Sequence, residues 1–197
     1  MFFKHLVTSI LALLLLTVIT GLLYPLLVTG VAQIAFPGKA NGSLLRRNGG
    51  VVGSELIGQP FSDPKYFWSR PSATSPFPYN AASSGGSNYG PTNPALIDEV
   101  KGRIADLKKV DSLNTVPVPV DLVTSSASGL DPHVSVASAM YQVPRVARVR
   151  GLSEDRVREI VDRYTEGRSL GFIGEPHVNV LDMNLALDDI HSTGGER

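Results

Sequence analysis

The hydrophobic pattern divides the chain into one long apolar run and a remainder in which apolar and polar positions alternate. Residues 6–36 contain no charged side chain. A helix needs about 20 apolar residues to cross the hydrocarbon core of a bilayer, and a run of this length would form a helix of about 46 Å. We therefore predict a single transmembrane anchor in residues 1–36, either tilted or continuing as a helix beyond the lipid.

A cleaved signal peptide is the alternative interpretation of this run. Lys4 gives a weakly basic start, and Gly30, Val31 and Ala32 offer a cleavage position for a peptidase. The apolar part of a signal peptide is about 7–15 residues long. Length therefore favours the retained anchor.

The rest of the chain predicts an α+β domain of several helices and a small sheet. Residues 48–50 (Asn-Gly-Gly) separate two short runs of strand character, which is typical of a tight hairpin. Asn93 and Ser153 each precede an apolar stripe of helical period and are good helix caps. We predict a helix after each of them.

Further elements follow from weaker patterns. Residues 117–123 predict an edge strand, and residues 177–181 alternate and predict a late strand. Asp131 and Pro132 are suited to the start of another helix, which Pro144 would interrupt or restart.

The domain organisation has one unusual segment. We predict a membrane-proximal connector with short strands at 37–60, an extracytoplasmic domain at 61–190 that includes an ordered loop at 61–93, and a flexible tail at 191–197. Residues 61–90 hold half of the chain's aromatic residues and several prolines, so regular structure and disorder are both disfavoured. Such ordered loops are often functional. The candidate functional or interface residues of this loop are Ser83, Ser84, Gly85, Gly86, Ser87, Asn88 and Tyr89.

Charge and cysteine content narrow the function classes. The 18 basic and 18 acidic residues balance, which argues against a nucleic-acid partner. The absence of cysteine excludes disulfides, cysteine-based zinc sites and thiol catalysis. Arg145, Arg148 and Arg150 are followed by acidic residues, so we interpret this region as a mixed, solvated helix surface.

Residues 128–133 place a hydroxyl, a carboxylate and an imidazole in one short segment. A catalytic triad needs convergence in space, which neighbours in sequence seldom achieve. We favour a structural turn formed by Ser128, Gly129, Asp131, Pro132 and His133, with Asp131 as a helix cap. A metal site from Asp131, His133 and His177 would also need convergence. The Ser-Gly-rich segment at 83–88 lacks the lysine of a phosphate-binding loop. We therefore predict no catalytic residue, no metal and no bound cofactor.

Small residues and a proline within the apolar run favour contact with another helix. Thr17 and Gly21 lie one turn apart, which allows close helix approach. Pro25 removes a backbone donor and would kink the helix, and Tyr24 could contact an interface or a partner. We propose these four residues as partner-packing positions in the membrane.

The charges beside the run leave the orientation open. Lys4 precedes it, whereas Lys39, Arg46 and Arg47 follow it. A simple positive-inside count would put the domain in the cytosol, but long domains cross largely regardless of charge.

Several ordered segments match one known family. They are Tyr24-Pro25 and residues 53–59, 66–73, 82–88, 121–124, 128–133, 174–176 and 178–181. Together they resemble the C subunit of the Kdp-type potassium-transporting P-type ATPase of bacteria and archaea. The likeness runs from the anchor to about Leu187. His177 stands where the family commonly has arginine, which puts any charge role of this position in doubt.

The resemblance implies membership of an ATP-driven, high-affinity potassium uptake complex. Its partners would be a channel-like potassium-binding subunit, a P-type ATPase subunit with a phosphorylated aspartate and a small single-span subunit. ATP, Mg²⁺ and K⁺ would bind those other subunits. This chain would be non-catalytic and support assembly and stability, with its N-terminus inside and its main domain outside the plasma membrane. A role of the 61–90 loop in shaping the ion entrance is a hypothesis.

Two other classes stay open on the residues alone. One is a secreted hydrolase that uses Ser128, Asp131 and His133. The other is an extracytoplasmic sensor that binds a small ligand. A nucleotide-binding role has also been considered for the family, but an exterior domain would not meet cytosolic ATP.

Overall fold

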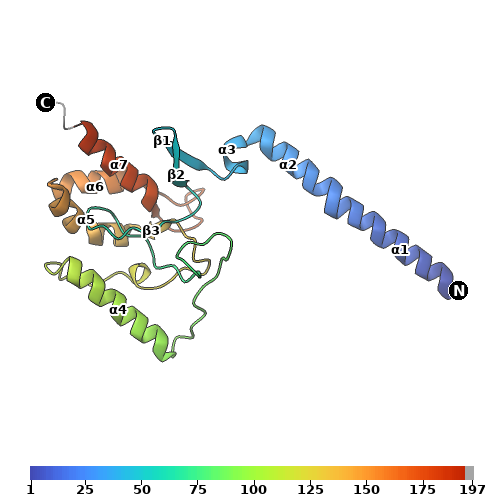
Figure 1. Ribbon diagram of the computed structural model, residues 1–197, viewed down its shortest axis with the longest axis horizontal. Helices are drawn as coiled ribbons and strands as arrows, with labels where there is room; N and C mark the ends of the chain where they lie inside the picture. The colour runs from blue at the N-terminus through green and yellow to red at the C-terminus, as the bar shows by residue number, and fades with distance from the viewer. Residues whose placement is uncertain (194–197) are drawn as a thin grey trace.

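The N-terminal part of the chain is one continuous helical rod that projects from a compact domain (Figure 1). The computed structural model describes residues 1–193. The rod consists of α1 (Phe2–Val18), a π-helical turn η1 (Ile19–Leu23) and α2 (Tyr24–Ala35). It is 34 residues long, and its most apolar 18-residue window has a mean hydropathy of 2.6 and is not buried against the domain. The rod is therefore long and apolar enough to cross a membrane, as the sequence predicts.

Pro25 lies in the first turn of α2, directly after the π-helical turn. Proline cannot donate a backbone hydrogen bond, and it pushes its ring against the preceding turn. A π-helical turn is a common way to accommodate such a disturbance inside a longer helix. The helix thus continues past Pro25 into α2.

A short connector and a hairpin join the rod to the domain. Helix α3 (Pro37–Ala40) is followed by the antiparallel strands β1 (Leu44–Arg47) and β2 (Gly50–Ser54). Asn48 and Gly49 between them have φ values of 50° and 81°. Two left-handed residues in a two-residue turn match the twist of paired strands, so the predicted hairpin is confirmed.

A three-stranded antiparallel sheet and three helices form the main layer pair. The strands are β3 (His133–Ser135), β4 (Thr165–Glu166) and β5 (His177–Asn179), in the order β3-β5-β4. Helices α5 (Val136–Arg150), α6 (Glu154–Arg163) and α7 (Val180–Thr193) pack with it, and α4 (Pro94–Val110) lies along the opposite side (Figure 1). The α+β class is confirmed.

The core lies between α5, α6, α7 and the sheet. The largest fully buried apolar side chains come from all of these elements and from the 61–93 loop: Phe67, Val134, Val143, Val146, Val157, Val161, Val178, Val180, Met183 and Leu187. Val134 and Val178 face each other across the β3–β5 pair. The sheet is short, and the helices supply most of the buried area.

Two predicted helices are confirmed with their caps. Asn93 Oδ1 accepts from the Ala95 N–H at the start of α4. Ser153 Oγ accepts from the Arg156 N–H at the start of α6. Each cap satisfies an amide that the helix itself leaves unpaired.

Two other predictions are wrong. Residues 117–123 form no strand; a single 3₁₀ turn, η2 (Val120–Leu122), lies there. Prolines at 117 and 119 remove the donors that a strand would need. The helix predicted to start at Asp131 instead begins at Val136, capped by Ser135, and Pro144 lies inside it without ending it.

The last helix, α7, begins within the segment for which the alternation of apolar and polar residues predicts a strand. The strand predicted at 177–181 ends at Asn179, whose Oδ1 accepts from the N–H groups of Leu181 and Asp182. This side chain therefore starts α7 directly after β5. Helix α7 continues through Thr193, past the predicted tail boundary at 191, and residues 194–197 of that tail lie outside the described residues.

Candidate functional site

The 61–93 loop crosses the domain without forming a helix or a strand. Residues 55–93 are all described, and the named elements on either side are β2 and α4. Phe67 is fully buried, its N–H donates to Asn184 Oδ1, and Asn184 Nδ2 donates back to the Phe67 carbonyl. These two hydrogen bonds fix the loop to α7 at Phe67.

Two buried arginines hold the aromatic part of this loop. Arg145 donates to the carbonyls of Pro64 and Tyr66 and lies over the Trp68 ring at 4.8 Å. Arg150 donates to the Lys65 carbonyl and lies over the Tyr66 ring at 5.0 Å. The interpretation of these arginines as a solvated surface is therefore wrong for Arg145 and Arg150, which are buried; Arg148 remains partly exposed.

The Ser-Gly-rich segment lies against residues 126–130. The Gly85 N–H and the Ser84 hydroxyl both donate to the Ser128 carbonyl, at 2.9 and 3.0 Å. A Cβ on Gly86 would lie 2.9 Å from the Ala127 carbonyl oxygen, so glycine permits the close approach. Because the Gly85 N–H is bound to protein, it does not point outward to cradle a phosphate.

The turn at 126–130 is itself enclosed. The Gly129 N–H donates to Ser126 Oγ, and Ser72 Oγ donates to the Gly129 carbonyl at 2.7 Å. Gly129 has a φ of 67°, and a Cβ there would lie 2.7 Å from the Gly85 carbonyl oxygen. The 61–93 loop and this turn thus form one packed unit.

Asp131 holds a turn before β3 rather than a helix start. Its Oδ1 accepts from the His133 N–H at 3.0 Å, and its Oδ2 lies 3.0 Å from Arg70 Nη1. Burial raises the pKa of the Asp131 carboxyl, but hydrogen bonds from His133 and the charge of Arg70 outweigh burial and hold the pKa below its ordinary value. The carboxylate therefore stays ionised at neutral pH. Pro132 follows, and its carbonyl accepts from the Val180 N–H.

The residues of a hydrolase do not converge here. Ser128 Oγ accepts from the Leu130 N–H, and within the described chain no hydrogen bond joins Ser128 to His133. Nucleophilic catalysis would require a base bonded to the hydroxyl. The order Ser128, Asp131, His133 therefore reflects a local turn.

His133 and His177 do meet, because β3 and β5 are neighbours. Their rings contact edge to face with centroids 4.5 Å apart. Asp131 Oδ1 lies 3.3 Å from His133 Nδ1, and Glu166 Oε2 lies 3.8 Å from His177 Nε2. Among the side chains that the structure describes, those of residues 1–190, no three histidine or acidic groups are arranged to hold a metal ion. The expected lack of a bound cofactor stays a prediction.

The candidate face of the anchor is open to solvent or lipid. Thr17, Gly21, Tyr24 and Pro25 are all exposed along the rod. A Cβ on Gly21 would meet only the Thr17 methyl, at 3.9 Å. The two small residues thus leave a shallow notch one turn before Pro25, of the kind that allows close helix contact. The partner-packing role stays a prediction.

One helix long and apolar enough to span a membrane, followed by a packed α+β domain, defines a single-span membrane protein with one folded domain. Comparison with known proteins agrees. The family model for "K+-transporting ATPase, c chain" matches residues 6–189. The chain belongs to this family, the accessory C subunits of potassium-transporting ATPases.

Curated relatives are similar over almost their whole length. Each carries the name Potassium-transporting ATPase KdpC subunit. That of Methylococcus capsulatus is 61% identical over 185 residues, which cover 94% of this chain and 97% of the relative. That of Sorangium cellulosum is 62% identical over 184 residues, covering 93% and 97%. That of Herpetosiphon aurantiacus is 58% identical over 181 residues, covering 92% and 94%.

Proposed function

We propose that this chain joins the channel-like and P-type ATPase subunits of a potassium uptake complex and stabilises their association. The observation that carries the proposal is the family match from residue 6 to residue 189, which includes the anchor as well as the domain. A small single-span subunit is the expected third partner. ATP, Mg²⁺ and K⁺ would bind the other subunits, and this chain would perform no catalytic step.

The anchor supplies one part of the proposed interaction. The exposed notch at Thr17 and Gly21, followed by Tyr24 and Pro25, would pack on the channel-like subunit. Lipid supplies no hydrophobic driving force between helices, so transmembrane helices associate through close packing, which small residues permit. The exposed notch on this single span therefore offers a packing site for a helix of the channel-like subunit.

The domain supplies the other part. We propose that it faces the exterior, with the N-terminus in the cytoplasm, and that residues 83–89 lie near the external ion entrance. The support is that the 61–93 loop is irregular but fixed by buried contacts, and that Tyr89 at its end is partly exposed. A rigid loop on a packed scaffold is suited to positioning a binding surface.

The test is purification of the full-length protein in mild detergent from potassium-starved cells of its own host. Recovery with a P-type ATPase and a channel-like subunit, and with potassium-stimulated ATP hydrolysis, is the expected result. A single cysteine placed at Leu113 should react with a membrane-impermeant maleimide in intact cells (in bacteria with an outer membrane, after that membrane is permeabilised). Recovery of the chain alone, or as a soluble form lacking the anchor, would contradict the proposal.

A further inference from the structure

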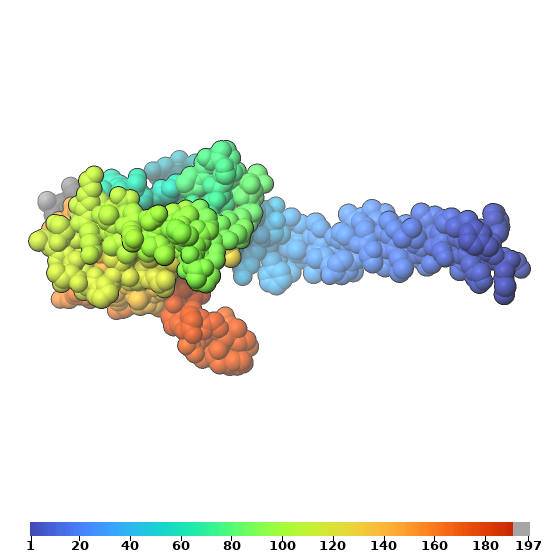
Figure 2. Space-filling view, turned by 90° about the horizontal axis from the view of Figure 1, so that it is seen from below, coloured from blue at the N-terminus to red at the C-terminus, as the bar shows by residue number. Residues whose placement is uncertain are grey.

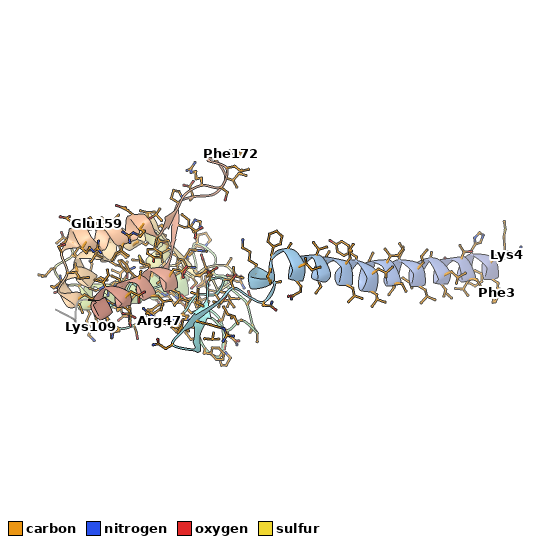
Figure 3. The ribbon with its side chains drawn as sticks, turned by 90° about the horizontal axis from the view of Figure 1, so that it is seen from above. Phe3, Lys4, Arg47, Lys109, Glu159 and Phe172 are labelled. Atoms are coloured by element: carbon orange, nitrogen blue, oxygen red, sulfur yellow. The ribbon has the colours of Figure 1, made fainter. Side chains whose placement is uncertain are left out.

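Residues 166–176 form a projection that stands away from the domain, and we name it the finger. Figure 2 shows it as the orange lobe that protrudes below the domain, and Figure 3 shows Phe172 at its end. Leu170, Phe172 and Ile173 are 83%, 71% and 52% exposed. Three large apolar side chains gathered at one exposed tip indicate an interaction surface rather than scattered surface residues.

The tip of the finger is a closed, uncharged turn. Ser169 and Ile173 exchange two backbone hydrogen bonds, both 2.9 Å long. Arg168 and Glu175 pair at 2.7 Å below it, and residues 169–174 between them carry no charge. The charged groups thus lie at the base of the finger, and its end carries only apolar or uncharged side chains.

The backbone of Leu170 has a conformation that is unfavourable for leucine. Its φ is 54°, in the left-handed region that glycine adopts freely and leucine seldom does. Its side chain contributes nothing to the domain core, because it is almost fully exposed. An outlier of this kind at an exposed tip points to a function of the side chain outside the domain.

The finger leans toward the end of the domain from which the anchor leaves. Figures 2 and 3, seen from opposite sides, both show it inclined toward the α2–α3 junction. The rod of α1, η1 and α2 fixes the bilayer on that side of the domain. A bilayer spanned by the rod would therefore lie on the side toward which the tip leans, and the anchor would keep the tip close to its surface.

We propose that the finger tip, Leu170, Phe172 and Ile173, inserts into the interfacial layer of the lipid bilayer beside the anchor. Apolar side chains enter the boundary between headgroups and acyl chains to a depth of about 5–10 Å. Because the anchor already holds the domain at the bilayer, the tip meets the lipid at a high effective concentration. A small apolar tip is therefore sufficient for stable insertion. The finger would then fix the tilt of the domain on the membrane, whichever side of the membrane the domain faces.

The test uses the absence of cysteine from the natural chain. The full-length variant F172C is labelled with an environment-sensitive nitrobenzoxadiazole dye and reconstituted into phosphatidylcholine vesicles that carry spin-labelled lipid. We expect blue-shifted emission that a shallow spin label quenches more than a deep one. L113C is the matched control, because Leu113 is 76% exposed and follows α4, whose end at Lys109 lies at the opposite end of the domain (Figure 3).

L170C provides a second labelling position in case F172C alters the tip. Equal quenching of the tip and Leu113 dyes would overturn the proposal. Reconstitution of the whole complex separates lipid from protein as the occupant. Blue-shifted emission that lipid spin labels no longer quench in the complex would mean that a partner subunit covers the tip, and this would also overturn it. Quenching that persists in the complex supports it.

Discussion

At the scale of single residues, the most informative side chain is Arg145. It is 2% exposed, and it bonds two loop carbonyls and Gln142 while it covers the Trp68 ring. Burial lowers the pKa of the Arg145 guanidinium to about 10, so it remains charged at neutral pH. A buried charge of this kind is tolerated because its donors are satisfied. The side chain thus fixes an irregular loop to α5 where no strand pairing is present.

We predict that Arg145→Met destabilises the domain by about 3 kcal/mol, because loop carbonyls are left without a donor. Urea unfolding in detergent, followed by fluorescence of Trp68, the only tryptophan, measures this. Arg156→Met is the control, since the exposed pair of Arg156 with Glu159 should contribute less than about 1 kcal/mol. Equal effects of the two substitutions would show that Arg145 has no special role.

At the scale of elements, helices with local signals were predictable and those set by distant contacts were not. Helices α4 and α6 follow from a cap and an apolar stripe that lie next to each other in sequence. The strands β3, β4 and β5 have two or three residues each, so pairing partners decide them rather than periodicity. The burial of Arg145 has the same cause, because the two loop carbonyls that it bonds lie about 80 residues earlier.

The start of α5 depends on such a distant partner. Asp121, in η2, accepts hydrogen bonds from the Ser135 N–H, the Ser135 hydroxyl and the Ser138 hydroxyl. We predict that Asp121→Ala lowers the free energy of unfolding by about 2 kcal/mol, because donors at the helix start lose their acceptor. Asp155→Ala is the control, with a 90% exposed carboxylate in the first turn of α6. Denaturant midpoints that coincide for both variants would refute the prediction.

The anchor helix carries its own prediction. Gly21→Leu fills the notch beside Thr17, so we expect the chain to insert normally but to lose most of its co-purifying partner subunits. Gly30→Leu, further along the same helix, also has free space around it and should keep the complex. Quantitative blotting of the partners after affinity purification measures both variants. Full recovery with Gly21→Leu would exclude packing at this notch.

At the scale of the whole molecule, contacts between the connector and the C-terminal part hold the domain to its anchor. Arg47 in β1 pairs with Asp189 in α7, and Asn179 donates to the Glu55 carbonyl. The Gly58 N–H donates to the Leu130 carbonyl, which joins the connector to the turn before β3. These contacts hold the connector against the C-terminal part of the domain.

We predict that Gly58→Ala loosens this junction. A Cβ at Gly58 would lie 2.7 Å from the Asp131 carbonyl oxygen and 2.3 Å from Tyr79 Cε1, so backbone must shift, at a cost of about 1–3 kcal/mol. Gly90→Ala meets nothing within 4 Å and should be nearly neutral. Thermal unfolding in detergent compares them. An unchanged midpoint for Gly58→Ala would show that the junction adapts freely.

The proposed entrance role is also a property of the assembled molecule. If Tyr89 lies at the ion entrance, Tyr89→Ala should raise the potassium concentration for half-maximal uptake, by about fivefold for a loss of about 1 kcal/mol. Leu113→Ala, an exposed residue beyond α4, should leave uptake unchanged. Rubidium or potassium uptake by cells with intact complexes provides the measurement. Identical kinetics for the two variants would remove the loop from the entrance.

The strand order has a consequence for biosynthesis. The strand made last, β5, lies between β3 and β4. Both earlier strands therefore have exposed edges until residues 177–179 emerge, and synthesis proceeds at about 5–20 residues per second. The anchor is inserted long before that point. For some seconds each new molecule is thus a membrane-bound chain with an unfinished sheet, whose open strand edges can pair with other chains.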